Sequence, residues 1–150
     1  MKQQFVIENT REREKLRMLV NSLTDYELNL VIYKEGWTIA AALVHLAFWD
    51  NYALALLKKW KKDGVSPSHH EWGNINDALL PIALNIPPRV AAELAVSSAD
   101  TTDREVEQST PEFIKAVEAL KEPFRLNRSI HRKTHLDEIE SFLASKSKNS

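Results

Sequence analysis

The chain contains no cysteine in its 150 residues. This absence excludes disulfide bonds, zinc sites made of thiolates and a cysteine nucleophile, and it is compatible with a reducing cytoplasm. Glycine is scarce as well, with three residues, and no stretch alternates between apolar and polar side chains as a half-buried strand does. The sequence therefore predicts an all-α protein.

The chain also lacks an excess of charge of either sign, because its formal net charge is −1. Bulk attraction to nucleic acid or to an anionic membrane surface is therefore not expected. The N-terminal stretch MKQQFVIENTRERE has no apolar core of the kind that a signal peptide carries. We expect a cytoplasmic protein that binds neither nucleic acid nor membrane.

One apolar run extends from Ile39 to Leu57 and approaches the length that spans a bilayer. It includes His45, Asp50 and Asn51, and a carboxylate near the middle of a membrane span is costly. A buried helix in a soluble helical bundle explains this run better than a membrane span does.

Apolar spacing, capping residues and prolines predict where the helices begin and end. Thr38 can cap the long apolar helix, and Pro111 can occupy the first turn of a later one. We expect one domain over residues 1–150, an up-and-down four-helix bundle with one or two short extra helices. The expected long helices cover about 6–23, 38–62, 88–108 and 124–144, and the tail from about 145 to 150 is expected to be disordered.

Two parts of the chain are less regular. The stretch SSADTTDREVEQS, in the expected helix over 88–108, has few large apolar side chains, so it is either exposed or turned toward a polar pocket. The stretch VSPSHHEWG is expected to be a loop before a helix capped by Asn74. Its adjacent histidines, His69 and His70, do not converge as residues four apart on a helix do. A solvated loop is favoured, with a lid anchored by Trp72 as the alternative.

The segment SIHRKTHLDEIESF holds two histidines four residues apart, His131 and His135. Residues at this spacing lie one above the other on a single helix face. At about 100° per residue, this face also carries Ile139 and Phe142, so we expect it to be dry. His45 likewise points toward the bulky apolar face of its own helix.

Three inward imidazoles need partners, because a buried polar group without one costs about 1–3 kcal/mol. Hydrogen bonds within the core would satisfy them singly. Alternatively, the pair formed by His131 and His135 can chelate one ion, as histidines at this spacing do in zinc proteases. His45 would then complete a set of three protein ligands with one open position, which is the arrangement of a catalytic zinc site.

Two carboxylates lie near these histidines in the sequence. Glu138 falls close to His131 on the helix face, where it could orient a ligand histidine or act as a general base. A solvated glutamate is the alternative reading. Asp50 follows His45 but points well away from it, so we interpret it as an interhelical or surface carboxylate.

The two motif regions, GWTIAAALVHLAFWD and SIHRKTHLDEIESFL, resemble the DinB/YfiT-like superfamily of metalloenzymes. Its members begin the second helix with Trp-Ser/Thr, place a histidine about seven residues later, and carry His-x-x-x-His on the final helix. The matching positions in this chain are Trp37, Thr38, His45, His131, His135, Leu136 and Ile139.

This resemblance implies a four-helix bundle, often a homodimer, that holds one divalent metal through His45, His131 and His135. Characterised relatives are thiol transferases that use bacillithiol or mycothiol. Two features depart from the pattern. Ala41 stands where the family often has an acidic residue, and the proline-containing region over 81–88 has no clear counterpart, so the substrate is not implied.

Three functions follow for the chain. The first is a metal-dependent enzyme, a thiol S-transferase or a hydrolase acting on a small molecule. The second is a non-catalytic, metal-stabilised dimeric binding bundle, and the third is an interaction domain without metal. Imidazole ligands suit zinc or nickel, and also iron or copper, so the ligand types do not select the ion.

Overall fold

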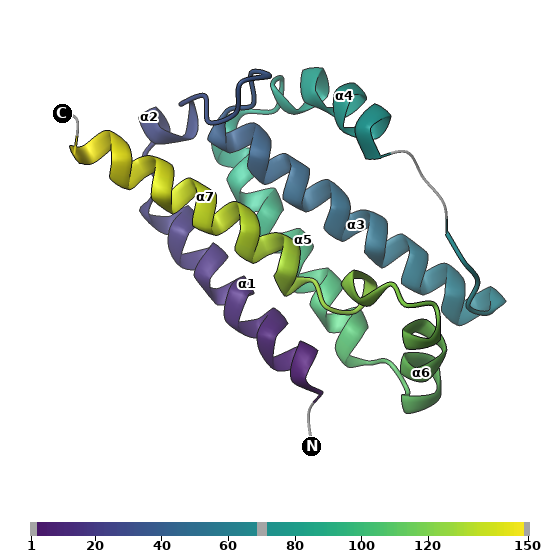
Figure 1. The fold of residues 1–150 in the computed structure, drawn as a ribbon. Helices are drawn as coiled ribbons and strands as arrows, with labels where there is room; N and C mark the ends of the chain where they lie inside the picture. Colours follow the sequence, from purple (N-terminus) through teal and green to yellow (C-terminus); the bar gives the residue numbers. More distant parts are fainter. Residues whose placement is uncertain (1–2, 69–71, 149–150) are drawn as a thin grey trace.

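The computed structural model describes residues 3–68 and 72–148. Over these residues the chain is mainly helical, which agrees with the all-α prediction. Four long helices lie side by side, with shorter helices around them (Figure 1). In chain order the helices are α1 (Gln4–Ser22), α2 (Asp25–Leu28), α3 (Ile39–Asp63), α4 (Trp72–Ala83), α5 (Pro88–Glu107), α6 (Pro111–Ala119), the 3-10 turn η1 (Pro123–Arg125) and α7 (Ser129–Lys148).

The four long helices do not alternate in direction as the up-and-down prediction requires. Asn51 on α3 hydrogen-bonds Ser98 on α5, and Lys61 further along α3 pairs with Glu105 further along α5, so these two helices run parallel (Figure 1). The chain achieves this because the connection over 64–87, which contains α4, carries it back along the bundle before α5 begins. The structure is therefore a four-helix bundle with a long crossover rather than short hairpin turns.

Helix α3 lies at the centre of the core, and α5 packs against it with small side chains. The second half of α5, which we expected to be exposed or to face a polar pocket, is instead buried on one face. Small residues let two helix backbones approach closely, which explains why a stretch poor in large apolar groups is buried. The buried residues of α5 are Ala91, Ala92, Ala95, Ser98, Ala99, Thr102, Asp103 and Val106.

Several helix boundaries differ from the predicted ones. Helix α7 begins at Ser129, later than expected, because the preceding residues form the separate turn η1. Helix α4 begins at Trp72 rather than after a cap at Asn74. Helix α7 also continues to Lys148, so the tail is helical to that residue, while residues 149–150 lie outside the described part of the chain.

A tight turn before α3 brings one aromatic side chain back over the bundle. The Ile32 amide donates to the Trp37 carbonyl at 2.9 Å, and Gly36 has a positive φ of 105°, which a residue with a side chain rarely adopts. Thr38 then caps α3, its hydroxyl accepting from the Ala41 amide at 3.0 Å, as predicted. The turn fixes the position of Tyr33 relative to the start of α3.

Helix α3 is long and apolar enough to cross a membrane by length and composition, and among the described helices it alone meets that test. However, most of its apolar window is buried inside the bundle. The burial of this helix inside the bundle agrees with the interpretation drawn from its sequence.

Charged side chains form a buried ion network that ties three long helices together. Asp50 of α3 accepts from Arg128 at 2.9 Å, and also contacts Arg132 of α7 at 3.3 Å. Arg132 reaches Asp103 of α5 at 2.7 Å, and Arg13 of α1 contacts the same carboxylate at 3.0 Å. We refer to Asp50, Asp103, Arg128 and Arg132 as the ion network. It fixes the rotation of α7 about its own axis.

Candidate metal centre

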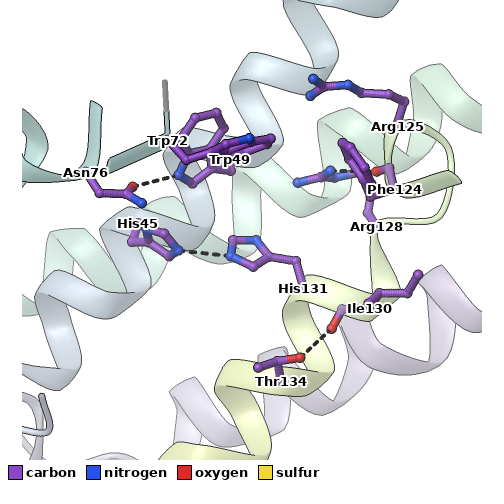
Figure 2. Close-up of a pocket in the computed structure, with 10 residues that line it drawn as sticks. All are labelled: His45, Trp49, Trp72, Asn76, Phe124, Arg125, Arg128, Ile130, His131 and Thr134. Atoms are coloured by element: carbon purple, nitrogen blue, oxygen red, sulfur yellow. Dashed lines mark hydrogen bonds between the residues drawn. The ribbon is translucent and has the colours of Figure 1, made fainter. Parts of the chain in front are cut away.

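Three imidazoles meet between α3 and α7. The Nε2 atoms of His45 and His131 are 2.9 Å apart (Figure 2), and the ring centroids of His45 and His135 are 4.9 Å apart. The rings of His131 and His135 are 4.8 Å apart, as expected for residues one helical turn from each other. The three histidines singled out in the sequence therefore come together, from two helices far apart in the chain.

The spacing of the imidazole nitrogens suits a single ion. One nitrogen from each of His45, His131 and His135 can be chosen so that all three lie within 4.8 Å of one another. A tetrahedral zinc ion with bonds of about 2.0–2.1 Å places its ligand nitrogens about 3.3 Å apart. Small side-chain rotations would bring the three nitrogens to that separation.

The environment keeps these imidazoles neutral. Burial lowers the pKa of His45 to about 4, that of His131 to about 2 and that of His135 to about 4. The other imidazoles of the cluster add to the shift at His45 and His131, because two positive charges this close repel. A histidine must be neutral to bind a metal, so at pH 7 all three are ready to act as ligands.

Tyr33 determines which nitrogen of His135 is available. The Tyr33 hydroxyl is 2.8 Å from His135 Nδ1. Burial raises the pKa of Tyr33, and a hydrogen bond with Glu138 raises it further. With Tyr33 donating to the Glu138 carboxylate, its oxygen accepts from His135 Nδ1–H, which leaves Nε2 of His135 free for an ion. Sequence reasoning missed Tyr33, because only the turn before α3 brings it here.

Glu138 lies beside the cluster at its solvent side. Its Oε1 atom is 3.7 Å from His135 Nδ1, and 42% of its side chain is exposed. We expected Glu138 next to His131, but its contact is with His135, because it lies three residues along α7 from that ring. The position of Glu138 supports a role in orienting His135 through Tyr33. A role as general base stays a prediction.

Helix α4 reaches the cluster through Asn76. The Asn76 side chain hydrogen-bonds His45, and its Oδ1 accepts from Trp49 Nε1 at 3.0 Å (Figure 2). On the other side of His45, the Trp37 ring meets it edge to face with centroids 5.7 Å apart. Helix α4 thus contributes a direct neighbour of the candidate ligands.

Two cavities share His45 and Asn76 in their linings. The first, of about 410 Å³, is also lined by Trp49, Trp72, Phe124, Arg125, Arg128, Ile130, His131 and Thr134, and we call it the arginine cavity. The second, of about 370 Å³, is lined by Tyr33, Glu35, Trp37, Ala42, Gly73, Asp77 and His135, and we call it the acidic cavity. A ligand can therefore approach the imidazoles from either cavity.

The histidine face of α7 is wetter than its sequence indicated. The deepest positions belong to Arg132, Leu136 and Ile139, whereas His131 and His135 are only half-buried. The ion network explains this, because drawing Arg132 into the core turns the histidines toward the two cavities. The expectation of a dry face was correct for Ile139 and correct only in part for the imidazoles, which are intermediate in exposure.

The remaining sequence candidates divide clearly. Asp50 is a buried interhelical carboxylate, which is one of the two alternatives that its position left open. Trp49 lines the arginine cavity, and Trp72 stacks near it with ring centroids 4.3 Å apart. His69 and His70 lie outside the described residues, so the lid interpretation is not addressed.

The residues present fit a divalent transition metal. Three neutral imidazoles converge, one has its ring oriented by Tyr33, and two cavities leave space for a further ligand. The set contains only nitrogen donors, and it leaves the full +2 charge of a divalent ion uncompensated. Such a donor set is typical of catalytic rather than closed structural sites, which have four protein ligands.

A comparison with protein families matches the DinB superfamily over residues 8–140. This span covers most of the chain, including all of α3 and α5, most of α1, the first part of α7 and the three histidines, so the protein belongs to the DinB superfamily. Searches of curated proteins and of solved structures each found no match.

Proposed function

We propose that this protein is a metal-dependent enzyme that acts on a small molecule, with transfer of a thiol sulfur as the first candidate reaction and hydrolysis as the second. The observation that carries the proposal is the convergence of His45, His131 and His135 as neutral imidazoles beside open cavities. Membership of the DinB superfamily and this histidine cluster both fit a metal-dependent enzyme.

The chain's own residues would divide the work. His45, His131 and His135 would hold the ion, and the bound ion would lower the pKa of a water or a thiol. Tyr33 keeps the ring of His135 in the orientation that its ligand role needs. Glu138 would accept a proton and pass it to solvent, and its partial exposure and its contact with Tyr33 support this role.

The two cavities favour transfer over hydrolysis. A transfer reaction brings two organic molecules together, and the cavities meet at His45 and Asn76. In such a reaction the thiol loses its proton, the sulfur forms a bond to an electrophilic carbon, and the leaving group departs with its electron pair. Hydrolysis would need only one organic molecule and a water, so a second cavity would have no obvious role.

The activity is tested with metal-loaded protein, bacillithiol and monochlorobimane, following the fluorescent conjugate. We expect conjugation above the uncatalysed rate, and its loss in the His45→Ala variant. Hydrolysis of 4-nitrophenyl acetate is followed in parallel with the same two proteins. Ester hydrolysis without conjugation would select the hydrolase, and neither reaction despite bound metal would favour the non-catalytic, metal-stabilised bundle.

A homodimer and a cytoplasmic location stay predictions. Three large apolar side chains, Ile82, Leu84 and Val90, are exposed near the junction of α4 and α5. Such side chains are where we expect a contact between two copies, and sedimentation analysis of the purified protein decides the oligomeric state.

A further inference from the structure

The arginine cavity combines positive charge with aromatic walls. Arg125 and Arg128 line it together with Trp49, Trp72 and Phe124, and among the described residues that line it there is no carboxylate (Figure 2). Buried arginines are costly unless their donors are satisfied. We therefore asked where each guanidinium places its hydrogen bonds.

Arg128 leaves part of its guanidinium unused. Its Nε donates to Asp50 at 2.9 Å and its Nη1 donates to the Phe124 carbonyl at 2.7 Å. No group in the described part of the chain accepts from its Nη2, although the residue is only 3% exposed. Its charge also reaches His131, whose protonated form it disfavours. Arg128 thus presents a donor to the cavity beside a candidate metal ligand.

Arg125 shows the same pattern. Its Nε donates to Glu122 and its Nη2 donates to Ser68, while Nη1 has no acceptor within residues 3–68 and 72–148. The residue is 2% exposed, and its guanidinium lies near the rings of Phe124 and Trp72, at 4.9 and 5.8 Å from their centroids. Two nearly buried arginines therefore line one cavity, each with an N–H group that has no acceptor among the described residues.

The acidic cavity provides the contrast. Its lining within residues 3–68 and 72–148 includes Glu35 and Asp77 and no lysine or arginine. Because His45 and Asn76 line both cavities, an anion near the imidazoles would be favoured in the arginine cavity and repelled in the acidic cavity. The difference in charge between the two cavities therefore favours one orientation of an anionic ligand at the site.

We propose that the arginine cavity binds the anionic group of an aromatic or similarly flat apolar substrate, a carboxylate or a phosphate, with Arg128 and Arg125 as donors. Trp49, Trp72 and Phe124 would contact the apolar part of the molecule. The remainder of the substrate would then extend toward His131 and His45, where the reaction takes place. The role of this molecule as a substrate rests on the proposed function. Its binding in the arginine cavity does not.

Binding is measured by isothermal titration of the full chain with 2-naphthoate, 2-naphthyl phosphate and the uncharged 2-naphthamide. These probes share a ring system that the cavity of about 410 Å³ can hold, and they differ in the charged group. We expect at least one anionic probe to bind ten times or more tighter than the amide. The anion that binds more tightly shows whether the cavity prefers a carboxylate or a phosphate. Equal binding of all three probes would overturn the proposal.

Substitutions locate the effect. Arg128→Gln and Arg125→Gln should each remove most of the preference for the anion. Because Arg128 belongs to the ion network and its loss can unfold the protein, Arg125→Gln and the half-exposed Trp72→Ala are the more robust variants. Trp72→Ala should weaken all three probes alike. Arg104→Gln, an exposed arginine outside the cavity, is the matched control and should change nothing.

The titrations are run on chelator-treated and on metal-loaded protein, which separates the two proposals. Anion binding that depends on Arg125 in protein that takes up no metal would sustain this inference and refute the metal-dependent enzyme. Metal uptake with no preference for the anionic probes would refute this inference and leave the metal-dependent enzyme standing.

Discussion

Two polar clusters lie next to each other between α3 and α7, with the ion network extending to α5, and the two clusters differ in the charges that they bring together. In the ion network, Asp50 and Asp103 face Arg128 and Arg132, so every charge has a partner of the opposite sign. In the histidine cluster, three groups of the same kind face one another, and each resists protonation. The ion network pairs opposite charges within the chain, whereas the histidine cluster groups three ligand atoms that could hold a metal ion.

This difference separates the roles of adjacent residues on α7. Arg132 is completely buried and sets the rotation of the helix, while its neighbour His131 faces a cavity. Breaking the network should cost stability, and breaking the histidine cluster should cost metal binding. The substitutions below test whether these two effects are as separate as the geometry indicates.

The largest effect is expected from Asp103→Ala. Removing this carboxylate leaves Arg132 buried with one partner fewer, and removing one member of a buried pair costs about 3–5 kcal/mol. Urea denaturation measures the loss. Asp100→Ala, which removes an ion-pair partner nearer the surface of the same helix, should cost no more than about 1 kcal/mol. Equal losses in the two variants would show that the network is not the main determinant of stability.

His135→Ala should abolish tight metal binding and leave the metal-free fold intact. Loss of a hydrogen-bond partner of a ligand typically costs about 10–100-fold in metal affinity, so loss of the ligand itself should cost more. Competition with a chelator of known affinity gives the dissociation constant. Loss of cooperative unfolding in metal-free His135→Ala would mean instead that the ring is needed for the fold.

Tyr33→Phe should weaken metal binding by about 10–100-fold without abolishing it, because His135 loses the group that orients its ring. The same competition assay detects the change. Phenylalanine keeps the aromatic ring, so the variant removes little besides the hydroxyl. An affinity equal to that of the unmodified protein would exclude Tyr33 from any part in the site.

The metal-free protein should lose stability as the pH falls below about 6.5, the ordinary pKa of histidine. Each cluster histidine has a lowered pKa in the folded chain, so the unfolded chain binds more protons in this range. The contribution of each histidine to the free energy of unfolding is complete above about pH 6.5. For His45 and His135 it decreases as the pH falls toward about 4, by up to about 1.4 kcal/mol per pH unit for each. Denaturation curves at several pH values check the slope, which should be shallower in His131→Ala. A flat profile would contradict the burial of the rings.

Much of the fold follows from the sequence because its signals are local. Thr38 caps α3 as predicted, and the apolar run identifies the central helix. The direction of α5 did not follow, because it depends on how the connection over 64–87 returns along the bundle. The burial of α5 was also missed, since its alanines and its Ser98 lack the bulk that usually marks a core.

The site shows the same division. The spacing of His131 and His135, together with His45, was enough to identify three candidate ligands. Tyr33 and Asn76 could not be found, because a tight turn and a separate helix bring them to the histidines. The pairing of Arg132 with Asp50 and Asp103 likewise joins three helices. The four-residue spacing of Arg128 and Arg132 was a signal that could have been noticed.

Metal analysis of the protein purified without a histidine tag tests the central claim most directly. The account predicts about one transition metal ion per chain, and thermal stabilisation of chelator-treated protein when zinc or nickel is added. Less than about a tenth of an equivalent of any transition metal, with no thermal shift on adding either ion, would contradict it.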